Sequence, residues 1–297
     1  MTGAERGFLL LSSHLGEAAR KPLTTAQLRT LADRMAYGNR SEEDRDLAPE
    51  DLTALGYSSA MAEHIVRLLS EDDVLDYYLR KGKVLGCEPI TRISEHYPHH
   101  LRIRLGLESP GVLWARGDVK LLTQPMVSLV GSRELEEKNW KFAAEVGRQA
   151  ARQSYVLVSG NARGADRAAQ ESCLEAGGKV ISVVSDELWK QPLRENALYL
   201  SEDDFEAAFS AQRALSRNRV IHALGIVTFV AQSSLGSGGT WDGTVKNLQN
   251  PWSAVYGFHD GSAAMTELSQ MGLQFIGMED LKDFYDLPEM EQNIFDR

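Results

Sequence analysis

The sequence predicts an α/β protein: an extended Rossmann-like parallel sheet with helices on both faces, preceded by a small helical domain. Two observations support this prediction. From about residue 112 onward, short continuous apolar runs alternate with amphipathic stretches of helical period, which is typical of parallel strands buried on both faces. Before that point, residues 25–80 show apolar residues at helical spacing instead.

The N-terminal helical domain is expected to span residues 1–95. In "LTTAQLRTLADRMA", Thr24 or Thr25 is a candidate N-cap, and Leu28, Leu31 and Met35 follow at helical spacing. "RSEEDRDLAPED" is a polar break, after which "SSAMAEHIVRLLSEDDVLDYYLR" resumes the helical period.

The sheet domain is expected over residues 96–285, followed by a short acidic tail at 286–297. The expected strands are the apolar runs of "PMVSLVGSR", "SYVLVSGNARG", "KVISVVSD", "LGIVTFVAQSSLGSGG" and "WSAVYGF". The helices expected between them are "NWKFAAEVGRQAARQ", "GADRAAQESCLEAG", "GTWDGTVKNLQ" and "SAAMTELSQMG". This alternation predicts parallel crossovers.

Composition fits a globular protein of the cytoplasm. Hydrophobic residues make up 43% and charged residues 25% of the 297 residues, so a well-packed core is feasible. No apolar run reaches the roughly 18 residues of a membrane-spanning helix, and the N-terminus has too short an apolar segment for a secretory signal. Cys87 and Cys173 lack metal-ligand spacing and are expected to be reduced thiols.

The net charge of −10 is unevenly distributed along the chain. Residues 1–95 carry 12 basic and 16 acidic side chains, residues 96–225 carry 17 and 16, and residues 226–297 carry 3 and 10. The middle of the chain therefore holds more than half of all Lys and Arg. This distribution permits a local basic surface of the kind that binds nucleic acid, but not a global one.

Three polar loops follow expected strands and precede expected helices. They are "GSR" at 131–133, "SGNARGAD" at 159–166 and "SSLGSGGT" at 233–240. Because ligands bind beyond the carboxyl ends of parallel strands, these loops should lie together at one edge of the sheet. Free backbone amides, helix N-termini and glycines at such turns form anion sites. Arg133 and Arg163 would add forked donors suited to phosphate.

None of the three loops matches a nucleotide fingerprint. The dinucleotide motif G-x-G-x-x-G and the nucleoside-triphosphate motif G-x-x-x-x-G-K-[ST] are both missing from the sequence. We therefore expect no NAD, ATP or other cofactor.

A basic segment, "QRALSRNRVIHALG" at 212–225, leads into the expected strand of "LGIVTFVAQSSLGSGG". Arg213, Arg217 and Arg219 lie within seven residues with no acid among them. If the segment is helical, Arg213 and Arg217 are four residues apart and share a face. The alternative is a solvated basic helix end.

Catalysis finds little support in the sequence. The seven histidines are scattered, and the adjacent pair His99 and His100 does not have metal-ligand spacing. No G-x-S-x-G motif and no clear carboxylate pair is present. His222 lies in an apolar segment and is expected to be structural. We therefore expect neither catalytic residues nor a metal site.

Taken in order, these stretches resemble the DNA-processing protein A (DprA, or Smf) family. "YPHHLRIRLGLESPGVLWARGDVKLL" resembles the lead-in to the family's sheet, and "VSLVGSR" its first strand and turn. "VSGNARGADRAAQESCLEAGGKVISVV" is similar to its SG-x-A-x-G-x-D helix start, and "SRNRVIHALGIVTFVAQSS" to its R-R-N-R segment. The N-terminal helices resemble its sterile-alpha-motif-like domain.

The resemblance implies a non-enzymatic protein that binds single-stranded DNA in a basic pocket. It also implies a homodimer that helps to load the RecA recombinase during DNA uptake, that is, in transformation and recombination. The residues that match the family's phosphate-binding positions, together with the third loop, are Gly131, Ser132, Arg133, Ser159, Gly160, Arg163, Gly164, Asp166, Arg217, Asn218, Arg219, Gly238, Gly239 and Thr240. Asp166 is expected to fix its loop through backbone or arginine contacts rather than to touch an anion.

The chain departs from the family pattern in four places. Gln170 stands where the family usually has histidine, and "SDELWKQPLREN" and "GSGGTWDGT" replace its usual loops. No C-terminal winged helix is expected after the sheet, which suggests a divergent subgroup.

Two other functions stay open. One is a phosphoribohydrolase acting on a nucleoside monophosphate, with Asp242 two residues after Thr240. The other is a sensor of a nucleotide-derived signal, for example in phage defence.

Overall fold

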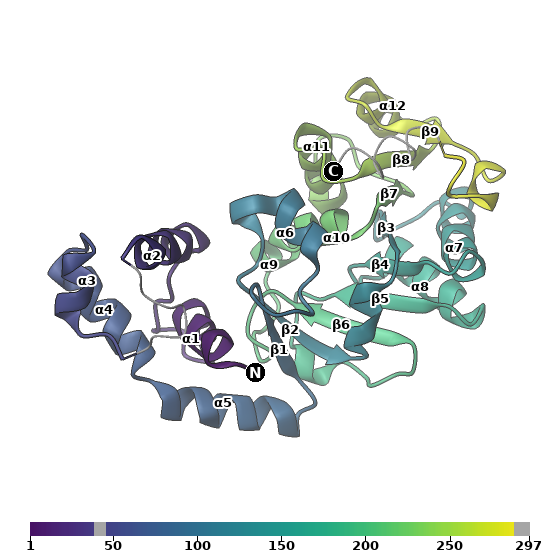
Figure 1. The fold of residues 1–297 in the computed structure, drawn as a ribbon. Helices are drawn as coiled ribbons and strands as arrows, with labels where there is room; N and C mark the ends of the chain where they lie inside the picture. The colour runs from purple at the N-terminus through teal and green to yellow at the C-terminus, as the bar shows by residue number, and fades with distance from the viewer. Residues whose placement is uncertain (39–45, 288–297) are drawn as a thin grey trace.

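One mixed sheet forms the centre of the protein (Figure 1). In the computed structural model, which describes residues 1–38 and 46–287, nine strands are ordered β1-β2-β6-β5-β4-β3-β7-β8-β9. The strands are β1 Glu88–Thr91, β2 Val112–Gly117, β3 Met126–Val130, β4 Val156–Ser159, β5 Lys179–Val183, β6 Ala197–Ser201, β7 Val227–Val230, β8 Ala254–Phe258 and β9 Gln274–Ile276.

The five apolar runs of the sequence are confirmed as β3, β4, β5, β7 and β8, all of them parallel to their neighbours. The predicted parallel sheet is confirmed, and it carries an antiparallel edge in addition: β1 pairs antiparallel with β2, and β2 pairs antiparallel with β6. Parallel sheets with an antiparallel edge are common in such folds.

Helices cover both faces of the sheet, as predicted. On one face lie α7 Glu137–Arg152 and α8 Ala165–Glu175; on the other lie α6 His99–Leu105, α10 Asn218–Leu224, α11 Gly238–Gln249 and α12 Ala263–Gln270. In β3, Val127 and Leu129 pack toward the first set, whereas Met126 and Val130 pack toward the second. Burial on both faces explains why this strand is a continuous apolar run.

The remaining elements are short. They comprise α9 Ala211–Ser216 and the 3₁₀ turns η1 Gly106–Glu108, η2 Val119–Thr123, η3 Leu188–Lys190 and η4 Asp280–Lys282. The helix α9 lies on the crossover from β6 to β7 and leads directly into α10.

The N-terminal region is helical, as the apolar spacing predicted. It contains α1 Gly3–Ser12, α2 Thr25–Tyr37, α3 Pro49–Ala54, α4 Ser59–Leu69 and α5 Asp72–Val84. Thr24 is the N-cap of α2 and forms a capping box with Gln27, which fixes where the helix begins. The first half of the predicted polar break "RSEEDRDLAPED", residues 40–45, lies outside the described residues, and α3 begins in its second half at Pro49.

An aromatic cluster joins the N-terminal helices to the sheet. Tyr78 of α5 stacks on Phe205 with ring centroids 4.5 Å apart, and both rings pack against Trp114 of β2. In addition β1, which lies within the expected domain 1–95, pairs with β2 of the sheet. We propose that the sheet domain begins near residue 88 and that the helices before it pack onto the sheet edge.

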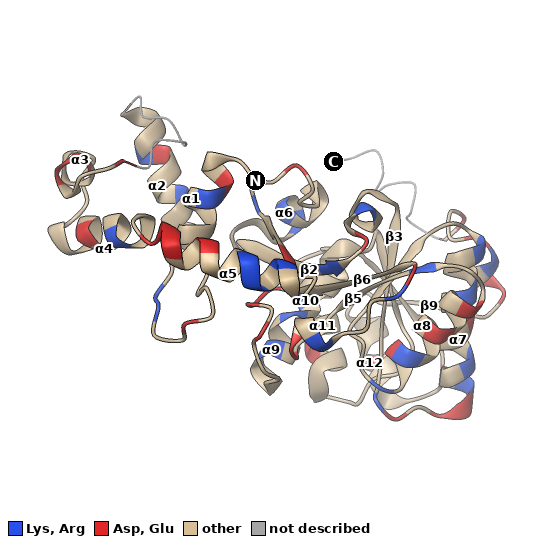
Figure 2. Ribbon diagram, turned by 90° about the horizontal axis from the view of Figure 1, so that it is seen from below, with Lys and Arg blue, Asp and Glu red and all other residues tan. Residues whose placement is uncertain are grey.

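Charges of both signs alternate on the outer helices. Figure 2 shows basic and acidic segments interspersed along α7, where Lys141 pairs with Glu137 and Arg148 with Glu145. Within the described residues, no helix is long and apolar enough to cross a membrane. Of the expected tail 286–297, residues 288–297 lie outside the described part.

Candidate functional site

The three predicted loops meet where the strand order reverses. From β3 the chain proceeds through β4, β5 and β6 on one side and then crosses to β7, β8 and β9 on the other. The loops after β3, β4 and β7 therefore flank this reversal at the carboxyl edge. Open α/β sheets bind ligands at such switch points.

A pocket of about 570 Å³, here called the loop pocket, lies between these loops and the β6–β7 crossover. Of the predicted site residues, it is lined by Gly131, Ser132, Arg133, Asp166, Arg217, Asn218, Gly238, Gly239 and Thr240. Residues more than 100 positions apart in the sequence thus converge on one hollow. The prediction that the loops share one edge of the sheet is confirmed.

Gly164 holds the first two loops together. The amide of Ala165 donates a hydrogen bond to the carbonyl oxygen of Ser132 at 3.1 Å. Gly164 has a φ of +82°, and a Cβ at this position would lie 2.5 Å from the carbonyl oxygens of both Ser132 and Arg133. A side chain here would therefore meet a strained backbone and a steric clash together.

Asp166 fixes the second loop from within. Its carboxylate accepts hydrogen bonds from the amides of Gly160 and Ala162, each at 3.1 Å. Burial raises the pKa of Asp166, and the positive charge of Arg217 opposes this shift. The predicted structural role of Asp166 is confirmed, since its carboxylate is committed to loop amides.

Arg217 is a buried cation beneath the loop pocket. Its guanidinium donates to the carbonyl oxygen of Gly160 at 3.1 Å and to Asn218 Oδ1 at 2.8 Å. Its Nε is buried and has no hydrogen-bond partner among the described residues. Burial lowers the pKa of Arg217, but a guanidinium remains charged in proteins. The pocket floor thus carries a positive charge with one unused donor.

The close approach of Arg217 requires glycine at position 160. A Cβ on Gly160 would lie 2.1 Å from two guanidinium nitrogens. The side chain of Arg217 therefore lies flat against the bare backbone of the second loop, and any larger residue at 160 would displace it.

Arg133 and the start of α11 add further positive potential. Arg133 is exposed at the pocket, and its side chain forms no ion pair or hydrogen bond with the described residues. The N-cap residue of α11, Ser237, makes no side-chain capping bond. A Cβ on Gly238, which has a φ of +87°, would meet open space. An uncapped helix start beside a free arginine attracts anions.

Two apolar side chains at the pocket were not predicted. Phe209 and Leu215 line it with exposed fractions of 55% and 44%. Exposed rings of this kind are used to stack nucleobases. The sequence does contain a signal for Phe209. This aromatic residue comes just before "AQRALS" in a stretch where no strand or helix period requires it.

The predicted shared basic face of Arg213 and Arg217 is wrong. Arg213 pairs with Asp203 at 2.6 Å and donates to the carbonyl oxygens of Ser185 and Ala207. Arg217 instead donates to the second loop, at the carbonyl oxygen of Gly160. Arg219 pairs with Glu202 at 2.6 Å. Acids that directly follow β6 therefore neutralise two of the three arginines.

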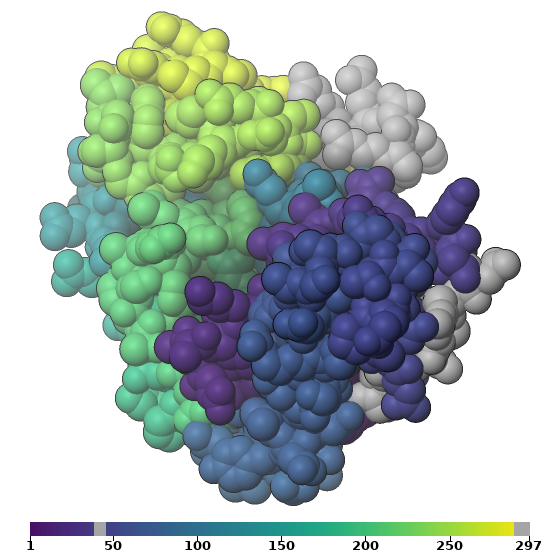
Figure 3. Space-filling model, turned by 90° about the vertical axis from the view of Figure 1, so that its left-hand side faces the viewer, coloured from purple at the N-terminus to yellow at the C-terminus, as the bar shows by residue number. Residues whose placement is uncertain are grey.

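Arg219 also faces a different hollow from Arg217. It lines a wide recess of about 1730 Å³ together with Thr24, Arg213 and Asp242, here called the interdomain hollow. Figure 3 shows this recess between the N-terminal helices and the green segments. The salt bridge of Asp242 to Lys246 measures 2.9 Å, so Asp242 does not face the loop pocket.

The other predicted residues lie around the loop pocket rather than in its lining. Arg163 is exposed on the outer side of the second loop. Ser159 is buried, and its Oγ accepts a hydrogen bond from Gln170, which also donates to Ser182. Gln170, the departure from the family histidine, thus links β4 to β5 below the loop.

His222 is a fully buried structural histidine, as predicted. Its Nδ1 lies 3.1 Å from Asn247 Nδ2, and burial lowers its pKa to about 3. Below pH 6.5, His222 takes up a proton in the unfolded chain but stays neutral in the folded one. The free energy of unfolding therefore decreases as the pH is lowered from 6.5 to about 3. Lowering the pH from 7 to 5 should cost about 2 kcal/mol of unfolding free energy from this group.

Urea unfolding of the wild type and of His222→Gln at both pH values measures this contribution. The variant should lose about 2 kcal/mol less stability between pH 7 and pH 5. Equal losses in the two proteins would contradict the assignment.

The fold and the site define the class of protein: an α/β protein with an arginine-lined pocket at the switch point of its sheet. The family model for DNA recombination-mediator protein A matches residues 88–246. The chain therefore belongs to the DNA recombination-mediator protein A family.

Curated relatives agree with this assignment. The chain is 25% identical over 204 residues to DNA processing protein DprA of Bacillus subtilis (strain 168), covering 63% of this chain and 68% of that protein. It is 30% identical over 141 residues to DNA processing protein DprA of Streptococcus pneumoniae, covering 44% of this chain and 50% of that protein.

Solved structures show the same fold. The X-ray structure of Streptococcus pneumoniae DprA matches with a TM-score of 0.71 at 21% identity, covering 95% of this chain and 97% of that one. A Helicobacter pylori DprA structure, described in terms of its single-stranded DNA binding mode, matches with a TM-score of 0.55 at 22% identity, covering 66% and 94%.

Proposed function

We propose that the chain binds single-stranded DNA in the loop pocket. The observation that supports this most directly is the combination of unpaired Arg133, buried Arg217 and exposed Phe209 around one hollow. Arginines and helix amides bind backbone phosphates, and an exposed ring stacks on a base of any sequence. A lone phosphate would not need the exposed apolar side chains.

Family membership and the Helicobacter pylori relative support the same function, because that protein is described by its single-stranded DNA binding mode. We further propose that the chain acts in DNA processing or recombination in the cytoplasm as a homodimer that delivers DNA to a RecA-type recombinase. In this proposal Arg163, on the outer side of the second loop, contacts a phosphate adjacent to the pocket.

We propose a binding rather than a catalytic role for the pocket. The one carboxylate in its lining, Asp166, is held by two loop amides. Asp242, the acid of the phosphoribohydrolase alternative, faces the interdomain hollow and pairs with Lys246. No observation on the described residues favours the phosphoribohydrolase. The experiment below distinguishes the sensor of a nucleotide-derived signal from a DNA-binding protein.

Fluorescence anisotropy with a 20-nucleotide single strand, the matching duplex and AMP at two salt concentrations tests the proposal. The single strand should bind most tightly, and its affinity should fall steeply with salt because bound phosphates release counterions. Arg133→Ala should weaken binding to all sequences alike and reduce the salt slope by about one.

Arg167→Ala is the matched control, since Arg167 is exposed on α8 and does not line the loop pocket. Its binding should equal that of the wild type. Tight binding of AMP with no binding of the oligonucleotide would contradict DNA binding and favour the sensor of a nucleotide-derived signal.

A further inference from the structure

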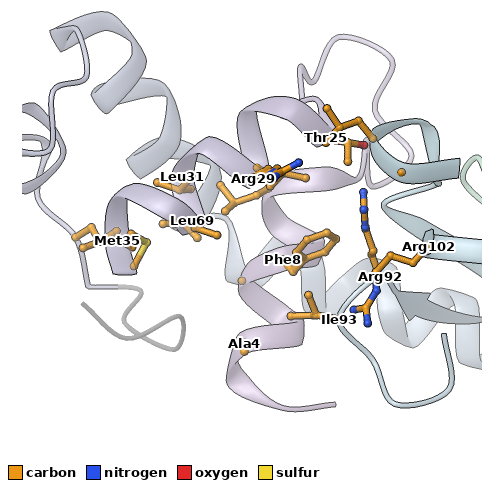
Figure 4. Close-up of a pocket in the computed structure, with 17 residues that line it drawn as sticks. Ala4, Phe8, Thr25, Arg29, Leu31, Met35, Leu69, Arg92, Ile93 and Arg102 are labelled. Carbon is orange, nitrogen blue, oxygen red and sulfur yellow. The ribbon is translucent and has the colours of Figure 1, made fainter. Parts of the chain in front are cut away.

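A second pocket lies where the N-terminal helices meet the sheet domain. It has a volume of about 350 Å³ and lies between α1, α2, the segment after β1 and η1; we call it the junction pocket. One end is aliphatic, with Leu31, Met35 and Leu69 labelled there in Figure 4. A volume of this size accommodates two or three apolar side chains of a ligand.

The opposite end of the junction pocket is cationic. Arg92 and Arg102 lie there beside Phe8 and Ile93, and Arg29 of α2 lies above them (Figure 4). Arg29 has a weak contact with Asp33 at 3.9 Å. The side chains of Arg92 and Arg102 form no ion pair or hydrogen bond within residues 1–38 and 46–287.

Arg92, which is half-buried, lies among the positive charges of Arg29 and Arg102. Burial and the positive charges of Arg102 and Arg29 lower the pKa of Arg92. By contrast, Arg6 of α1 has two carboxylate partners within the N-terminal helices, Asp72 and Asp76 of α5. A bound carboxylate group would offset these positive charges.

The rim of the junction pocket is also apolar. Ile93 is 40% exposed and Leu107 is 45% exposed. Apolar side chains exposed beside charged ones occur at protein interaction sites. The junction pocket thus has an aliphatic end, an apolar rim and three arginines at its opposite end.

We propose that the junction pocket binds a peptide segment of a partner protein in which apolar side chains alternate with carboxylates. Charge complementarity argues for this occupant, because three cations call for several carboxylates and a fatty acid supplies one. The aliphatic lining argues against a nucleic acid, whose bases stack on aromatic or guanidinium planes rather than fill a cavity of leucine and methionine. This site is separate from the loop pocket and shares none of its lining residues.

The test is anisotropy of a fluorescein-labelled peptide, Asp-Asp-Leu-Asp-Phe-Leu, titrated with the full chain. Arg92→Glu and Arg102→Glu should each weaken binding at least tenfold. Ile93→Ser, at an exposed position that leaves the fold intact, should weaken it severalfold. Arg167→Glu, which makes the same charge change on exposed α8, should bind the peptide as the wild type does.

Competition separates the other occupants. Decanoate and a 20-nucleotide single strand, each added in tenfold excess over the peptide, should leave the peptide bound. Displacement by decanoate would overturn the proposal in favour of a lipid site, and displacement by the oligonucleotide in favour of a second DNA contact. Equal peptide binding by the wild type and Arg92→Glu would overturn it as well.

Discussion

Replacing Arg217 by Ala is expected to lower the affinity for single-stranded DNA by about ten- to a hundredfold. This range corresponds to about 1.5–3 kcal/mol for one hydrogen bond to a charged group. The variant removes the positive charge beneath the loop pocket and the Nε donor that has no partner among the described residues. It also leaves the carboxylate of Asp166 without its main favourable charge, so the melting temperature should fall too.

A second variant separates the loss of affinity from the loss of stability. Gly160→Ala keeps the arginine, but its Cβ would collide with the guanidinium, so DNA binding should weaken with the charge still present. Arg217→Lys should recover part of the affinity at low salt, because lysine keeps the positive charge. The recovery should be incomplete, because lysine lacks the paired donors of the guanidinium group. Wild-type affinity of folded Arg217→Ala would contradict the role of this residue.

Replacing Gly164 by Ala is expected to give the largest loss of stability among the loop variants, because it combines backbone strain with a clash. The backbone at Gly164 has a φ of +82° and a ψ of −125°, a combination that residues other than glycine rarely adopt and that costs them about 1–3 kcal/mol. In addition, the new Cβ would lie 2.5 Å from two carbonyl oxygens of the first loop. Urea unfolding should therefore show a loss above about 3 kcal/mol, the upper end of that range, and DNA binding should weaken as Arg133 shifts.

Gly177→Ala is the matched control for this prediction. Gly177 has a φ of +77°, close to the +82° of Gly164, but a Cβ there would meet no atom within 4 Å. It should show the strain alone, about 1–2 kcal/mol, with unchanged DNA affinity. Equal losses of stability in the two variants would mean that the packing between the first two loops contributes nothing.

The sequence predicted the central strands well because burial on both faces makes them continuous apolar runs. It missed β1, β2 and β6, which lie at or beside the antiparallel edge, and the three-residue strand β9 at the opposite edge. In β2, for example, the burial of "VLWARG" ends at Arg116 and Gly117. The pairing of β2 with β6 joins residues far apart in the sequence, and no local pattern encodes that choice.

The candidate site was predicted in outline but not in its charges. Glycine-bounded turns after apolar runs located the three loops correctly. The ion pairs of Arg213 with Asp203 and of Arg219 with Glu202 could not be predicted, since each depends on how the β6–β7 crossover folds back. The same crossover places Phe209 at the pocket. The neutralisation of Arg213 and Arg219 and the position of the Phe209 ring therefore both depend on tertiary structure.

The route of the chain through the loop pocket has a consequence for folding. Arg133 and Asp166 come from the loops after β3 and β4, whereas Arg217 arrives only after the chain has completed β6 and turned back. A nascent chain that stops before residue 211 has most of the sheet but cannot form the pocket. A ligand that binds only the completed pocket shifts the folding equilibrium toward the native state by mass action. Bound DNA would therefore contact both halves of the sheet at once and would stabilise the β6–β7 crossover against local unfolding.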